Sequence, residues 1–192
     1  MNYKKGIALI KKFKSDFEST GLKSPGLLGF IGELYVLQKL DELGYNPHHK
    51  GGQGGYDIYI EKIDKRVEVK TSILKNEGEY DDKSIKFWGW AVERRGQKRS
   101  KKFDYFVCVA LDDHYSNPKF YIFTYKEAFS VKNVRVPRYT NIKKKIHIFK
   151  DILTFRKACL RDPKMVTPFE RTINQNQTLF RNQWKKIKLE LP

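Results

Sequence analysis

The sequence predicts an α/β fold in which helices flank a central, mixed β-sheet. The order of patterns along the chain is helix, hairpin, strands and helices, which is typical of a layered α/β domain. The segments Phe103–Leu111 and Phe120–Tyr125 are continuously apolar, as expected of strands that are covered on both faces. With 192 residues, the chain is long enough to bury a core without disulfides or a structural metal.

The N-terminal part predicts two helices. Within residues 3–19, apolar residues recur at helical spacing with lysines between them, so we expect an amphipathic first helix. Ser24 and Pro25 are typical of an N-cap and a first turn, and we expect the second helix to run to about Leu43. Glycines at positions 26, 29 and 32 indicate either close approach by another backbone or a helix that begins near Gly32.

The rest of the chain predicts strands followed by helices. Two alternating segments around a polar turn predict a β-hairpin, and an aromatic segment predicts a further strand. In chain order, the expected elements are strands over Tyr56–Glu61 and Arg66–Ser72, a strand over 84–92, a short helix from Lys126, and helices over Ile146–Leu160 and 173–189. We expect residues 1–160 to form the main domain and residues 161–192 a C-terminal helical extension.

The composition is strongly basic. Lysine plus arginine number 39 and aspartate plus glutamate 22, which gives a formal net charge of +17. A surplus of this size must lie mostly at the surface, because unpaired buried charge is costly. It favours a polyanionic partner, with a nucleic acid ahead of an anionic membrane surface.

The two cysteines predict neither a disulfide scaffold nor a metal site. Cys108 lies in an apolar run and is expected in the core, Cys159 lies in a helical pattern, and neither has a metal-binding type of neighbour. This cysteine usage favours a cytoplasmic setting. Lysines interrupt the early apolar residues, so no signal peptide is expected, and no apolar run reaches the length of a membrane span.

The predicted hairpin carries the residues most suited to chemistry. Alternate residues of a strand share a face, so Glu68 and Lys70 point away from the core side marked by Val67 and Val69. With a turn centred near residues 63–64, Asp57 pairs close to Lys70 and lies diagonal to Glu68. Two carboxylates suffice for Mg²⁺, which keeps several waters, and a nearby lysine can orient water or stabilise charge in phosphodiester hydrolysis.

The surrounding motifs resemble the PD-(D/E)XK nuclease superfamily, with the restriction-endonuclease-like and Mrr-like branches the most similar. The resemblance lies in three motifs and extends over roughly residues 25–128. The motifs are Gly32-Glu33 on an amphipathic helix, Gly55-Tyr56-Asp57-Ile58, and Val67-Glu68-Val69-Lys70-Thr71-Ser72. Two departures are Tyr56 where the family has proline, and a strand-like segment over 84–92 where a helix often comes in the family.

The resemblance implies a restriction-endonuclease-like core and a specific set of roles. Asp57 and Glu68 would bind the metal, Lys70 would assist the water, Glu33 would complete the site, and the Val69 carbonyl would be a further ligand. The implied activity is a Mg²⁺-dependent DNA endonuclease of the restriction type acting on double-stranded DNA, with Mn²⁺ as a substitute metal. Members of the family commonly cut the two DNA strands with two paired subunits. The resemblance therefore also implies a homodimer.

Other functions are also consistent with the sequence. A Holliday-junction resolvase would use the same chemistry but would read DNA shape. A non-catalytic nucleic-acid-binding module would use the acids structurally, and an RNA-associated protein is less favoured because no RNA-binding signature is present.

Several further residues have a predicted place. A dense basic run is expected to contact the DNA backbone. The run comprises Arg94, Arg95, Lys98, Arg99, Lys101 and Lys102. His48 and His49 are expected in a solvated loop before the glycine-rich stretch 51–55, and Trp88 and Trp90 are expected in the core.

Overall fold

A five-stranded sheet forms the centre of the molecule, in the order β1-β2-β3-β5-β6. The computed structural model describes residues 2–21, 24–51, 55–74, 84–94, 103–130, 142–161 and 168–187. The strands are β1 (Pro47–His49), β2 (Ile58–Ile60), β3 (Lys65–Ile73), β5 (Tyr105–Leu111) and β6 (Lys119–Thr124). Strands β3 and β5 are parallel and the other neighbours are antiparallel. The sheet is therefore mixed, and the predicted α/β class is confirmed.

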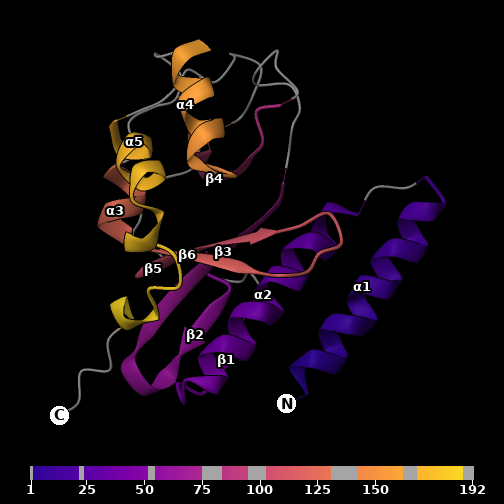
Figure 1. Cartoon of the computed structure of the whole chain (residues 1–192). Coiled ribbons are helices and arrows are strands. Elements are labelled where there is room, and N and C mark those ends of the chain that lie inside the picture. Colours follow the sequence, from indigo (N-terminus) through magenta and orange to yellow (C-terminus); the bar gives the residue numbers. More distant parts are fainter. Residues whose placement is uncertain are drawn as a thin grey trace.

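Helix α2 (Pro25–Glu42) packs on one face of this sheet, and α1 (Tyr3–Ser19) packs beside α2 (Figure 1). Helix α2 packs on β3 so closely that a Cβ on Gly32 would overlap the Thr71 side chain. A close approach is therefore present at Gly32, but the prediction of an approaching backbone is wrong, and Gly26 and Gly29 have no such neighbour. Because α2 begins at Pro25, the alternative start near Gly32 is wrong.

A two-stranded ribbon covers the other face, made of β4 (Phe87–Arg94) and β7 (Ile142–Phe149). Trp88 and Trp90 are buried against the sheet, and their indole N–H groups donate to the carbonyls of Leu111 (2.8 Å) and Val109 (3.3 Å). Helix α4 (Ile152–Arg161) packs on the outer side of the ribbon, where Phe155 and Ala158 meet Phe87 and Phe149. The molecule is thus layered from α1 and α2 to α4 (Figure 1).

Residues 168–187 close the exposed edge of the sheet beside β6. After α3 (Tyr125–Ser130), β7 and α4, the chain forms α5 (Pro168–Gln175) and two short 3₁₀ turns. The Ile122 N–H donates to the carbonyl of Phe180, and the Asn182 N–H donates to the carbonyl of Phe120. These bonds satisfy an edge that would otherwise stay open to pairing.

Two helix predictions are wrong in their bounds. The segment Ile146–Leu160 begins as the end of β7, because Ile146 and Ile148 alternate into the core with period two, and the helix starts only at Ile152. The segment 173–189 contains the end of α5 and then 3₁₀ turns at Gln177–Leu179 and Trp184–Lys186. There, buried Phe180, Trp184 and Ile187 follow the surface of the sheet instead of one helical stripe. The division into residues 1–160 and 161–192 stays a prediction.

The other predicted elements are present. The hairpin, the aromatic strand and the short helix at Tyr125–Ser130 all form, and Cys108 is buried in β5 while Cys159 lies in α4. His48 and His49 do not lie in a loop, since they form β1 with β2. In the part of the chain that the structure describes, no helix has the length and apolar character needed to cross a membrane.

Candidate active site

The β2–β3 hairpin places Asp57, Glu68 and Lys70 on one face. Ile58 and Val67 are paired and fully buried on the opposite face, against α2. The Asp57 N–H donates to the carbonyl of Val67 at 3.0 Å, so Asp57 lies beside Glu68. The predicted pairing of Asp57 with Lys70 is therefore wrong by two residues, although the shared face is correct.

The cause of this register lies in the turn of the hairpin. The chain turns through a 3₁₀ turn at Glu61–Ile63, and Asp64 follows in the left-handed region with φ of 46°. The observed turn is centred slightly before residues 63–64, where the polar stretch predicted it. A shift of two residues in pairing keeps the period-two alternation, so each side chain stays on its predicted face.

The Asp57 side chain is held by the backbone of β3. It is 8% exposed, and its Oδ2 accepts a hydrogen bond from the Val69 N–H at 2.7 Å. Val69 thus takes part in the site through its backbone, while its own side chain packs in the core. A backbone donor fixes the direction of the carboxylate without a mobile partner.

Glu68 is an acid in an environment that disfavours its charge. Its side chain forms an ion pair with Lys70 and is 16% exposed, compared with 40% for Lys70. Burial raises the pKa of Glu68, the nearby Lys70 ammonium opposes this rise, and the Asp57 and Glu33 carboxylates add to it. A cation bound beside Glu68 would favour the ionised form of this carboxyl.

Glu33 reaches the edge of this region from α2. Its Oε2 lies 2.6 Å from Nε2 of His49, and the edge of the His49 ring meets Phe30 at a centroid distance of 5.5 Å. The sequence predicted His49 in a solvated loop, because a three-residue strand gives no readable alternation. The structure instead places it in β1, beside the Glu33 carboxylate.

The donor types fit a hard cation such as Mg²⁺, which prefers carboxylate oxygens and retains water. Within the described residues, Oδ1 of Asp57 and Oε2 of Glu68 accept no hydrogen bond and remain available as ligands. No group of three or more His, Cys, Asp or Glu side chains in that part of the chain is already arranged to hold a metal. The arrangement corresponds to two carboxylates with Glu33 nearby, and not to a closed protein cage.

Cationic residues also lie on or beside this face. Arg66 is on the face of Glu68, and its guanidinium lies 5.6 Å from the Tyr56 ring centroid. Lys50, next to His49, lies 5.6 Å from the Tyr59 ring centroid. Of the predicted basic run, Arg94 ends β4, while Arg95, Lys98, Arg99, Lys101 and Lys102 lie outside the described residues.

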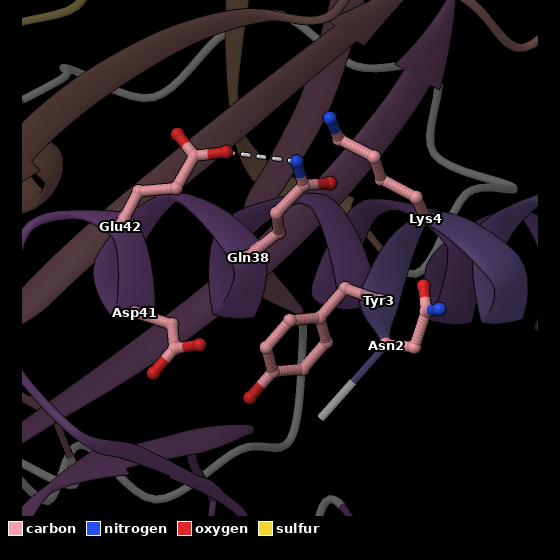
Figure 2. Close-up of a pocket in the computed structure, with 6 residues that line it drawn as sticks. All are labelled: Asn2, Tyr3, Lys4, Gln38, Asp41 and Glu42. Carbon is pink, nitrogen blue, oxygen red and sulfur yellow. Dashed lines mark hydrogen bonds between the residues drawn. The ribbon is translucent and has the colours of Figure 1, made fainter.

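A hollow in the surface lies elsewhere, between the start of α1 and the end of α2 (Figure 2). It is lined by Asn2, Tyr3, Lys4, Gln38, Asp41 and Glu42. In Figure 2, Gln38 donates to Glu42 within one helix, at 2.8 Å. Partial burial, and then the Asp41 charge, raise the pKa of Tyr3. These are pairs typical of solvated helix faces, and the candidate chemistry stays on the hairpin.

Comparison with known proteins supports the fold. No protein-family model matches the chain, and no curated protein matches it. Among solved structures, the chain is similar to a bacterial homing endonuclease, I-Ssp6803I, with a TM-score of 0.51 and 17% sequence identity. The match covers 86% of this chain and 93% of that chain. At this identity, the likeness concerns the fold.

Proposed function

We propose that this protein is a Mg²⁺-dependent DNA endonuclease of the PD-(D/E)XK type that cuts double-stranded DNA. The observation that carries the proposal is the placement of Asp57, Glu68 and Lys70 on one face of a hairpin, with Glu68 in an environment that disfavours its charge. The similarity in fold to a bacterial homing endonuclease supports the same class of activity.

Each residue has a distinct role in the proposed reaction. A bound Mg²⁺ supplies Lewis-acid chemistry, polarising the scissile phosphate and acidifying water. Asp57 and Glu68 would hold the cation, with Mn²⁺ as a substitute, and the Val69 carbonyl and Glu33 would complete the ligand set. Lys70 is partly exposed and can leave Glu68 to orient the attacking water or to stabilise charge on the phosphate.

The charge of the chain supports DNA as the substrate. A net charge of +17 favours exchange of condensed counterions for lysine and arginine. Arg66 and Lys50 border the site, and we propose backbone contacts for them and for the basic run Arg94–Lys102. Pairing of two copies, so that both strands are cut, is part of the same proposal and is tested by light scattering.

The test is cleavage of supercoiled plasmid with Mg²⁺, with Mn²⁺ and with EDTA. We expect metal-dependent cutting that Lys70→Ala lowers by at least about 100-fold, the scale typical of losing one group that stabilises transition-state charge. The matched control is Lys62→Ala, which removes the same charge from the exposed turn of the same hairpin, where Lys62 donates to the carbonyl of Gly44.

The outcomes separate the candidate functions. Cutting that is lost in Lys70→Ala and kept in Lys62→Ala supports the nuclease and its site together. Intact plasmid under all conditions, with intact four-way junctions and a salt-dependent gel shift, would instead favour a binding module. Cutting of junctions alone would assign a resolvase.

A further inference from the structure

We propose that His49 is a positioning residue that holds the Glu33 carboxylate in place for metal binding. The inference rests on the proposed function and extends its site to a residue that the motifs do not include. Nε2 of His49 lies 2.6 Å from Oε2 of the Glu33 carboxylate.

The direction of this hydrogen bond follows from its chemistry. A carboxylate that binds a cation is ionised and only accepts, so in that state Nε2 would donate the hydrogen. The side chains are 31% exposed for His49 and 18% for Glu33, so the carboxylate is the more shielded of the two. A glutamate has three rotatable bonds, and one fixed donor at its end selects among them.

A ring contact holds the His49 side chain, and backbone bonds hold its strand. Phe30 lies one helical turn before Glu33 on α2, and its ring meets that of His49 at an interplanar angle of 71°. On the strand side, His49 pairs with Ile58, and the N–H of the next residue, Lys50, donates to the carbonyl of Asp57 at 2.8 Å. Strand β1, which carries His49, is thus hydrogen-bonded next to Asp57, one of the proposed metal ligands.

The three carboxylates of the proposed site each have one polar partner. Asp57 accepts from the Val69 N–H, Glu68 is paired with Lys70, and Glu33 accepts from His49. Each has one oxygen oriented by a donor from β1 or β3. Donors of this kind orient the ligands of metal sites, and their loss typically costs 10–100-fold in metal affinity or activity.

His48 offers a matched control beside it. It alternates to the other side of β1, where its Nε2 lies 3.2 Å from Oε2 of the exposed Glu61. Positions 48 and 49 thus lie in the same strand, and each is a histidine paired with a glutamate. The same substitution can therefore be compared at both. Only position 49 touches the site.

The experiment measures Mn²⁺ binding by electron paramagnetic resonance and the Mg²⁺ concentration for half-maximal plasmid cleavage. The variants are His49→Phe, which keeps a ring but removes the donor, His49→Gln, which keeps a donor, and His48→Phe. For His49→Phe we expect the Mn²⁺ dissociation constant to rise about tenfold. The Mg²⁺ concentration for half-maximal cleavage should rise by a similar factor. We expect His49→Gln to recover most of this loss and His48→Phe to behave as the wild type. In a Glu33→Gln background, His49→Phe should add little further.

Each result decides the proposal. Wild-type Mn²⁺ binding in a folded His49→Phe variant, tighter binding, or an equal loss in His48→Phe would overturn it while the proposed function stands. A wild-type protein that neither binds Mn²⁺ nor cuts DNA would overturn both. If His49→Phe does not fold, as judged by circular dichroism, His49→Asn replaces it, because its shorter amide does not reach Glu33.

Discussion

Lys14 is a buried cation on the first helix, and its partners show how single residues attach α1 to the domain. Its side chain is 5% exposed and forms an ion pair with Glu18, and its ammonium also reaches Ser24. Glu18 in turn accepts a hydrogen bond from the Tyr115 hydroxyl at 2.9 Å. The Lys14 and Tyr115 hydrogen bonds lower the pKa of Glu18 to about 2, and burial and then Glu18 raise the pKa of Tyr115 to about 12.

This network predicts a pH-dependent contribution to stability. Because the pKa of Glu18 is lower in the folded chain than its ordinary value of 4.5, the contribution is present above pH 4.5 and is lost as the pH falls toward about 2. Glu18→Gln should therefore lower the melting temperature at pH 7 and have little effect at pH 2. Thermal unfolding across this range, with Asp16→Asn on the same helix as the control, measures it. A difference between Glu18→Gln and wild type that is independent of pH would contradict the assignment.

The site residues show how far sequence reasoning reaches at this scale. Asp57, Glu68 and Lys70 could be placed on one face because period-two alternation depends only on local geometry. The pair formed by Glu33 and His49 could not, because it joins two elements through the tertiary packing of α2 against β1. The partner of a polar side chain depends on which elements meet, and the sequence alone does not encode that in a readable pattern.

At the scale of elements, α2 must lie close enough to β3 to carry Glu33 to the edge of the site. Gly32 makes this possible, because a Cβ there would lie 2.9 Å from Cβ and 3.0 Å from Cγ2 of Thr71. The sequence predicted close approach here but assigned it to a backbone, whereas the Thr71 side chain makes it. It likewise mistook the end of β7 for a helix, since a short apolar run fits both periods.

The close packing predicts opposite effects at two glycines of the same helix. We expect Gly32→Ala to destabilise the fold by about 1–3 kcal/mol through overpacking. Gly26→Ala should instead stabilise it by about 1 kcal/mol, the helix propensity of alanine over glycine, because nothing lies within 4 Å of its Cβ. Urea denaturation of both variants measures the difference. Adding Thr71→Ala should recover part of the loss at Gly32, and equal effects at the two glycines would refute this packing.

At the scale of the whole molecule, two hydrophobic clusters lie on the two faces of one sheet. Val107 and Val109 of β5 face the cluster under α1 and α2, while Phe106 and Cys108 face the one under β4 and β7. The period-two alternation of β5 therefore joins the two halves of the molecule. It also explains why the strand is buried throughout and reads as continuously apolar in the sequence.

The C-terminal segment joins both clusters and so bears on the predicted division at residue 160. Phe180 packs in the cluster beside β4 and β7, whereas Trp184 and Ile187 pack in the one beneath α1 and α2. The Trp184 ring also meets Phe120 of β6 edge-on, at a centroid distance of 5.1 Å. If residues 168–187 are integral to one folding unit, loss of Trp184 must weaken the whole domain and not only its end.

Trp184→Ala tests this with a matched surface variant, Leu179→Ala. Trp184 is 7% exposed and Leu179 is 56% exposed, so only the first removes core packing. We expect Trp184→Ala to lower the free energy of unfolding by about 3–5 kcal/mol, as for large-to-small changes in other cores. Leu179→Ala should change it by less than about 0.5 kcal/mol. Hydrogen exchange of β3 and β5 amides reports whether the loss reaches the strands that carry the site. If exchange in Trp184→Ala speeds up only within residues 168–187, the C-terminal segment is a separable extension. If β3 amides lose protection equally, the C-terminal segment belongs to the folding unit that holds Glu68 and Lys70.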